Sequence, residues 1–391
     1  MTTVGERIAA ERKLAGLKQI QLAQKASYSV SMVRAVEQGR EPAAPGFIAA
    51  VARALRIEPE LLTGVPYYET LEADGPLEGL AELGSILAEG ADVRQVEPPA
   101  LTELARDLSA INLDCRNDRG RAALLRLPVL IRQLYGAIDA AGDDAERGRV
   151  FSLLAHAYMQ AEGLTHRFGF IALTMLALDR LEWAASYADN SLYVAQAKLE
   201  RKKALLYYGS NEVGLRLVEQ ALDMVSGDNV AATEVRGFAH LSGAILAARD
   251  RRLDVARDHI AEARKLALLV NGESDLFGTN FGSANVEIHA CAVELEAGDP
   301  GKAAREGSAL VLPKDIAPPR AGHHWQDTAR AWLLAGQPDK ALHSLTLARR
   351  VAPQQTRLHP SVRETLHGIA SAQRRQNDSL VSFASWARVA L

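Results

Sequence analysis

Five polar side chains between residues 285 and 330 have types that could bind a ligand: Asn285, His289, His323, Asp327 and Arg330. An asparagine amide both donates and accepts hydrogen bonds, so it can pair with the backbone of an extended peptide. Helices that only pack against one another do not need such residues. The alternative interpretation is that these are solvated side chains on the surface of a groove.

The sequence carries no signature of a metal centre or a catalytic nucleophile. Adjacent residues on a helix do not share a face, so His323 and His324 do not form a two-histidine site, and Glu287 with His289 lacks the H-E-x-x-H spacing. Two cysteines, Cys115 and Cys291, are too few for a four-ligand zinc site or a disulfide framework. There is neither a P-loop nor a G-x-S-x-G motif. We therefore expect a protein that is not an enzyme and that binds no metal or cofactor.

The composition indicates stacked helices rather than a β-sandwich. The chain has 391 residues, enough for two or more domains. Hydrophobic residues make up 48% and aromatic residues only 5%, and alanine recurs at helical spacing. The longest apolar stretch, around residues 168–178, is far shorter than a membrane-spanning helix, and the N-terminus has no hydrophobic signal core. We expect no membrane partner and a cytoplasmic location.

The charge of the chain is unevenly distributed. Residues 1–66 contain nine Lys or Arg against six Glu, whereas the chain as a whole carries a formal charge of −3. A basic N-terminal part on an acidic body suggests a polyanionic partner for the first part alone.

The first 64 residues divide into five short amphipathic segments. These segments would position the Lys and Arg side chains of the basic N-terminal part. They are expected at 4–14, with Ile8 and Leu14 facing inward, at 18–26, from Ser29 to Gly39, at 45–55 and at 58–62. Ser29 is a favourable N-cap for the third. The second and third segments, joined by Ser27 and Tyr28, have the spacing of a helix-turn-helix, in which the second helix enters the major groove.

The run LKQIQLAQKASYSVSMVRAVEQGREPAAPGFIAAVARAL within residues 4–63 resembles the XRE family, the phage-repressor type of helix-turn-helix. Several positions agree at once, including Gln19 at the start of the second helix, the inward pair Leu22 and Ala23, and Glu37-x-Gly39 at the end of the third. Ser27 departs from the pattern, because the family usually has glycine there. A serine at this position predicts slight strain in the turn.

The resemblance implies roles for individual residues. Those expected to contact DNA bases are Val30, Ser31 and Arg34, and those expected to contact phosphates are Lys18, Gln19 and Arg40. Arg34 could donate two hydrogen bonds to a guanine edge. Arg12 and Glu37 match a buried ion pair that fixes the first helix against the third. The alternative is a set of solvated charges on an unrelated helical bundle.

The rest of the chain contains irregular helical repeats. Residues 323–353 resemble a tetratricopeptide repeat, with small residues where two helices approach and a turn at Gly336. The turn at Gly298 repeats it, Ala244 and Ala172 mark earlier units, and residues 195–222 fit the pattern only loosely. We expect a right-handed superhelical solenoid of five or six helix pairs, capped by a helix over 379–391. The inner face of such a solenoid is where a ligand would bind.

These patterns predict an all-α protein in three parts: a helix-turn-helix domain at 1–66, a linker at 67–80, and a tetratricopeptide-like domain for ligand sensing and dimerisation at 81–391. The whole resembles a group of actinobacterial XRE regulators with such C-terminal domains, and its arrangement is similar to that of the peptide-sensing quorum regulators of Gram-positive bacteria. The resemblance implies a homodimer on a double-stranded DNA operator, controlled by a signalling peptide or small molecule. The alternative is an adaptor whose repeats bind a protein while the head tethers it to DNA.

Overall fold

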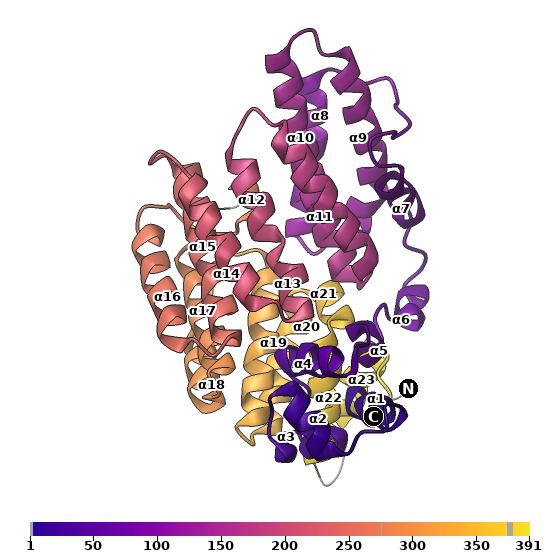
Figure 1. Ribbon diagram of the computed structural model, residues 1–391, viewed down its shortest axis with the longest axis vertical. Coiled ribbons are helices and arrows are strands. Elements are labelled where there is room, and N and C mark those ends of the chain that lie inside the picture. Colours follow the sequence, from indigo (N-terminus) through magenta and orange to yellow (C-terminus); the bar gives the residue numbers. More distant parts are fainter. Residues whose placement is uncertain (1–2, 275, 374–377) are drawn as a thin grey trace.

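The computed structural model describes residues 3–274, 276–373 and 378–391. Within these ranges every element is helical, apart from one bridge between Ser274 and Phe281. A small N-terminal group of helices lies against the C-terminal helices, and the remaining helices form a curved array (Figure 1). The fold is therefore all-α, a helix-turn-helix domain followed by an α-solenoid of helix pairs, as predicted.

The N-terminal domain, called the head below, contains five helices: α1 (Val4–Leu14), α2 (Gln19–Ala26), α3 (Val30–Glu37), α4 (Pro45–Leu55) and α5 (Pro59–Thr63). Its core is closed by fully buried aliphatic and aromatic side chains, among them Ile8, Leu22, Val33 and Phe47. Leu14 was predicted to face inward and this was wrong, because its side chain is 80% exposed at the last residue of α1.

The predicted linker at 67–80 is a packed segment and not a tether. It contains α6 (Tyr68–Ala73), whose Thr70 and Leu71 are buried. The Arg363 guanidinium lies 3.7 Å from the centre of the Tyr67 ring and donates a 2.7 Å hydrogen bond to Thr70 Oγ1. Cation–π and hydrogen-bond contacts from the C-terminal helices fix this segment in place.

The first part of the array has its own core, built by five helices and the segment before them. These are α7 (Leu80–Glu89), α8 (Leu101–Arg116), α9 (Gly120–Ala140), α10 (Asp144–Phe168) and α11 (Ile171–Ser186). Ala184 is fully buried here as a repeat residue should be, whereas Ala172 is exposed, so the prediction that Ala172 packs between helices was wrong.

The middle of the array follows with α12 (Leu192–Glu200), α13 (Lys202–Tyr208), α14 (Asn211–Met224), α15 (Val230–Arg249), α16 (Leu253–Ala267), α17 (Ser283–Glu296) and α18 (Pro300–Ala309). Alanines at the helix contacts, including Ala244, Ala256 and Ala263, have no exposed surface, so the paired helices α15 and α16 approach closely.

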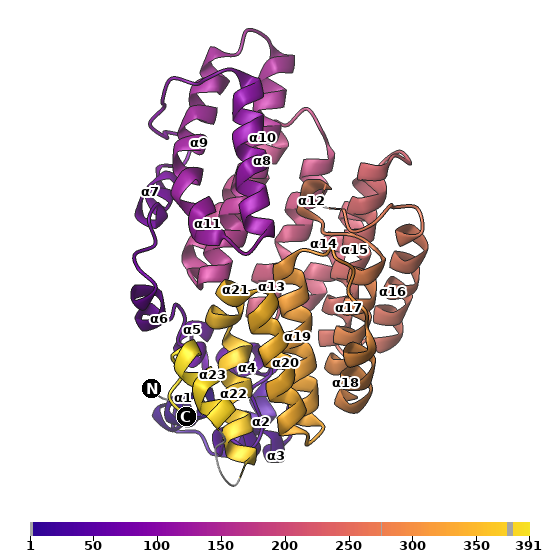
Figure 2. The same ribbon diagram turned by 180° about the vertical axis from the view of Figure 1, so that it is seen from behind.

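The last part comprises α19 (Pro318–Leu334), α20 (Pro338–Val351), α21 (Pro353–Leu358), α22 (Pro360–Ala372) and α23 (Asp378–Ala387). The predicted turns at Gly298 and Gly336 are confirmed, and both glycines have a positive φ, which a residue without Cβ adopts without steric cost. Seen from behind, α22 and α23 lie beside the head (Figure 2). The array therefore returns to the domain with which the chain begins.

Candidate DNA interface and candidate ligand cluster

The turn between α2 and α3 is held by local hydrogen bonds. Ser29 Oγ accepts a 3.1 Å hydrogen bond from the Met32 N–H, which caps α3 as predicted. Ser27, at the end of α2, has φ 59°, the left-handed conformation that favours glycine. The strain predicted for this serine therefore has a structural basis.

Arg12 and Glu37 form the predicted ion pair between α1 and α3. Arg12 Nε lies 2.6 Å from Glu37 Oε1 and Nη2 lies 2.9 Å from Oε2, with side chains only 10% and 5% exposed. Arg12 Nη1 also donates to the Leu17 carbonyl at 2.7 Å. The pair links the start of the helix-turn-helix to the end of α3 and fixes the orientation of α3.

The side chains predicted to meet DNA lie mostly on the outer surface of the head. Ser31, Arg34, Lys18 and Arg40 are exposed, and Val30 is half-buried. In the part of the chain that the structure describes, the Arg34 guanidinium has no ion pair or hydrogen bond, so it is available to a ligand.

Gln19, predicted to contact phosphate, also has a partner inside the head. Its Nε2 donates a 2.8 Å hydrogen bond to Glu37 Oε2 and so extends the Arg12 pair. Three other polar side chains on α2, namely Gln21, Gln24 and Lys25, are exposed and were not predicted. Their outward positions on α2 are the signal that could have identified them.

The head is attached to the array at several places. One is the Arg251 guanidinium, which lies 5.3 Å from the centre of the Tyr28 ring. Another is α13, where Tyr208 Oη donates to Glu58 Oε2 at 3.1 Å and Arg53 Nη1 donates to the Gly209 carbonyl at 3.0 Å. A further one is α22, where the Glu364 carboxylate lies near the backbone N–H groups of Val4 and Ala43, which act to lower its pKa.

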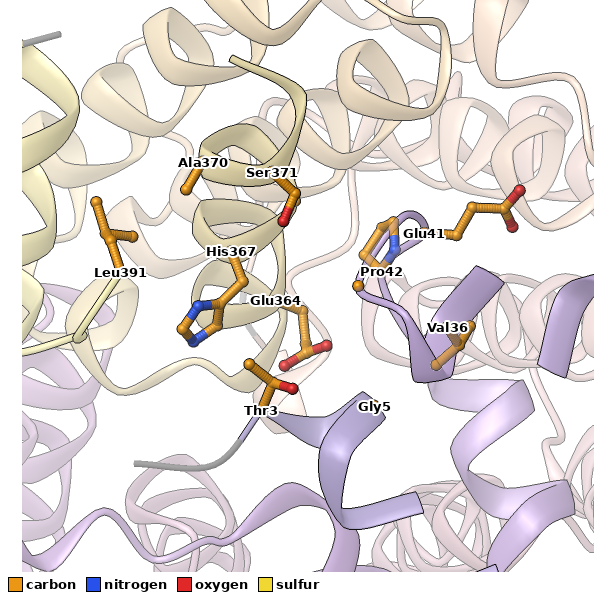
Figure 3. Close-up of a pocket in the computed structure, with 12 residues that line it drawn as sticks. Thr3, Gly5, Val36, Glu41, Pro42, Glu364, His367, Ala370, Ser371 and Leu391 are labelled. Carbon is orange, nitrogen blue, oxygen red and sulfur yellow. The ribbon is translucent and has the colours of Figure 1, made fainter. Parts of the chain in front are cut away.

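The α22 contact surrounds a cavity of about 300 Å³ between the two parts. In Figure 3, Glu364 points from α22 toward Thr3 and Gly5, with His367 beside it. Burial raises the pKa of Glu364 to about 7, although the two backbone donors and the charge of Arg7 act in the opposite direction. Burial also lowers the pKa of His367.

The five predicted ligand residues are not a set of free groove side chains. Asn285 is buried, and its Nδ2 donates to the Asn280 carbonyl, which leaves only Oδ1 without a protein partner among the described residues. Arg330 is buried too, and its Nη1 lies 3.2 Å from Glu296 Oε1. Asn285 and Arg330 are therefore buried and have partners within the protein, so they are not solvated groove side chains.

His289, His323 and Asp327 do come close to one another. His323 Nδ1 lies 3.1 Å from Asp327 Oδ2, and the charge of His323 contributes to lowering the pKa of His289, after burial and the charge of Arg320. The pKa of Asp327 is held well below its usual value by His323, with Arg330 and Arg320 adding to the effect against the cost of burial.

Sequence reasoning missed the cations around this group. Lys202 at the start of α13 and Arg320 in the first turn of α19 both act on the pKa of His289, as nearby positive charges that lower it. Neither residue belongs to the repeat pattern, so only the three-dimensional structure reveals them. We call Lys202, Arg320, His166, His289, His323 and His359 the inner cluster.

Among the residues described, no group of three His, Cys, Asp or Glu side chains has the arrangement of a metal site. No described helix is both long enough and apolar enough to cross a membrane.

Comparison with known proteins agrees with the class that the head defines. Residues 3–63 match the family model of a helix-turn-helix domain. The chain is also similar to the crystal structure of PlcR from Bacillus thuringiensis in complex with the peptide PapR7 and DNA, with 13% sequence identity, 89% of this chain and 99% of that chain covered, and a TM-score of 0.36. No curated protein matches the chain. The molecule is thus a helix-turn-helix domain carried by an array of helical repeats.

Proposed function

We propose that this protein is a sequence-specific, double-stranded DNA-binding transcription regulator. The observation that carries the proposal is the exposed, unpaired Arg34 on a third helix whose orientation is fixed by the buried Arg12–Glu37 pair. A guanidinium held on a rigid helix can donate two hydrogen bonds to guanine in the major groove. Ser31 and Val30 would contact neighbouring base edges.

Lys18 and Arg40 would contact the phosphates on either side. Both are exposed on the same domain, and such contacts orient a helix without reading sequence. The remaining amide N–H of Gln19 would add a phosphate contact while the other stays on Glu37.

We further propose that the protein acts as a homodimer and that the repeats sense a ligand. A single α3 covers one half-site, so two copies on a near-palindromic operator, about one helical turn apart, give the usual specificity. The head is attached to the array at α13 and α22, so a change in the array can alter the position of the head. A peptide or small molecule would control operator affinity in this way. Stable binding of a protein partner that leaves DNA affinity unchanged would instead favour the adaptor.

The test is selection of binding sites from random duplexes, followed by titration of the selected DNA with purified full-length variants. Arg34→Ala should weaken the selected site and relax preference at one position, whereas Lys18→Ala should weaken all sequences alike and lower the salt slope by about one. Arg106→Ala is the matched control, because Arg106 is an exposed arginine on α8, at the far end of the array from the head (Figure 1). The proposal would be overturned if no sequence were selected and Arg34→Ala bound DNA as the parent does.

A further inference from the structure

The inner cluster lies where several parts of the array meet. His166 comes from the end of α10, Lys202 from the start of α13, His289 from α17, and Arg320 with His323 from α19. His359 precedes α22, and its ring centre lies 5.2 Å from that of His323. The two ribbon views both place α13 beside α19 and α21 (Figures 1 and 2).

Arg320 is the most unusual member of the inner cluster. Its Nε is buried with no hydrogen-bond partner, and its side chain forms no ion pair with any residue that the structure describes. Burial lowers its pKa to about 10, despite the nearby negative charges of Asp327 and Glu273. A buried donor without an acceptor is costly, so the Nε of this partly exposed side chain indicates a position where an acceptor can bind.

Lys202 is a second cation without a bonded counter-charge. Its Nζ lies 3.7 Å from the centre of the Phe238 ring, a cation–π contact. The neighbouring carboxylates of Glu162 and Glu200 are instead bonded by Lys203, which lies 2.8 Å from Glu200 Oε2. Burial lowers the pKa of Lys202 to about 8; the positive charges of Lys203 and Arg320 add to this shift, and the negative charges of Glu200 and Glu162 oppose it.

The carboxylates near Arg320 are already occupied by other donors. Glu273 accepts backbone N–H groups of Ala284 and Asn285 at 2.7 and 3.3 Å. Asp327 faces His323 at 3.1 Å. Among the described residues, acceptors therefore serve the histidine and the backbone donors here, and none forms a hydrogen bond or ion pair with Arg320 or Lys202.

We propose that Arg320 and Lys202 bind the carboxylate of a small ligand. The planar Nε and Nη donors of an arginine match the two oxygens of a carboxylate, which explains the preference for this group over a neutral ligand. The carboxylate comes either from the free C-terminus of a short peptide or from a small organic acid. His166 and His289, whose pKa values are lowered by burial and by the surrounding cations, are neutral and offer further polar contacts.

The site has a direct structural connection to the head. Helix α13 begins at Lys202 in the inner cluster and ends at Tyr208 and Gly209, which bond to Glu58 and Arg53 of the head. A helix of seven residues is about 10 Å long and moves as one body. Ligand binding that displaces Lys202 thus moves the contact with the head. This consequence rests on the proposed function, whereas the binding site does not.

The experiment measures acylation of Lys202 in the full-length protein without DNA, mapped by mass spectrometry, with exposed Lys13 as internal reference. The probes are acetyl-trialanine with a free carboxylate, the same peptide amidated, and succinate. A carboxylate beside Lys202 raises its pKa, so acylation near neutral pH should slow about tenfold for each pKa unit. Protection by the peptide acid indicates a peptide C-terminus, and protection by succinate alone indicates a small acid; both support the site.

Three results would overturn the proposal. They are protection by none of the probes, equal protection by the amidated peptide, and protection in Arg320→Gln that equals that in the parent. Arg106→Gln should behave like the parent, and Arg320→Lys, which keeps the charge without the fork, should show weakened protection. The acid and amide comparison in the parent is informative even where a variant fails to fold. Operator affinity with and without the protecting probe is measured separately, so a failure of DNA binding leaves the labelling result intact.

Discussion

Replacing Arg12 with alanine isolates the energetic role of the pair between α1 and α3. The substitution removes two hydrogen bonds to Glu37, at 2.6 and 2.9 Å, and one to the Leu17 carbonyl at 2.7 Å. It leaves a carboxylate that is 5% exposed, with Gln19 as its remaining partner. Loss of one member of a buried pair costs about 3–5 kcal/mol.

Hydrogen exchange by mass spectrometry measures this loss within the intact chain. The slowest amides of α3 should exchange about 10²–10³ times faster in Arg12→Ala, because each 1.4 kcal/mol changes the opening equilibrium tenfold. Lys13→Ala, at the exposed neighbouring residue, should leave the rates unchanged. The double variant Arg12→Met with Glu37→Leu should be less destabilised than Arg12→Ala, since no charge is left buried. Unchanged α3 exchange in Arg12→Ala would refute the reasoning.

Three more outcomes are expected. Arg34→Ala should cost about 1–3 kcal/mol on the selected operator, measured by fluorescence anisotropy, and equal weakening on every sequence would contradict base recognition. Arg330→Ala should destabilise α17 and α19 by about 3–5 kcal/mol, because Glu296 is only 15% exposed and, among the described residues, would keep only the more distant Arg249 as a cationic partner. Hydrogen-exchange rates in α17 and α19 equal to those of the parent would disprove this. Docking of the head onto α22 should weaken as pH rises from about 5 to 8. The pKa of Glu364 is about 7 in the docked state, so in this range the docked carboxyl keeps a proton that an undocked carboxyl has released. The lowered pKa of His367 has the opposite effect on docking as pH rises. The measurement is therefore the pH dependence of hydrogen exchange in α1, corrected for intrinsic rates and compared between the parent and Glu364→Gln. The same pH dependence in both proteins would show that Glu364 does not have this role.

Most of the head could be predicted from the sequence because its signals are local. Ser29 caps α3, and Val33 and Val36 recur at helical spacing, so short-range patterns suffice. Leu14 shows the limit, since periodicity places it inward but α1 ends there and no neighbour covers it.

The ligand cluster could be predicted only in part because it depends on long-range packing. The repeat pattern located the correct helices, yet a polar residue on the first helix of a repeat can face a groove or a neighbouring helix. Asn285 and Arg330 have partners at Asn280 and Glu296, and no periodicity distinguishes these from free groove residues. Lys202 lies on the irregular helix α13, which the repeat pattern fitted only loosely.

The attachment of α22 to α1 changes how the array should unfold. An ordinary solenoid is an open chain of units, each contacting only its neighbours, so its ends fray independently. Here Glu364 on α22 lies against the start of α1, and the segment before α7 is held by Arg363, which joins the last units to the first part of the chain. The molecule is topologically a closed ring of contacts. Loosening any one unit strains both junctions, so unfolding should be more cooperative than in a linear array, and a perturbation at one junction should be felt at the other.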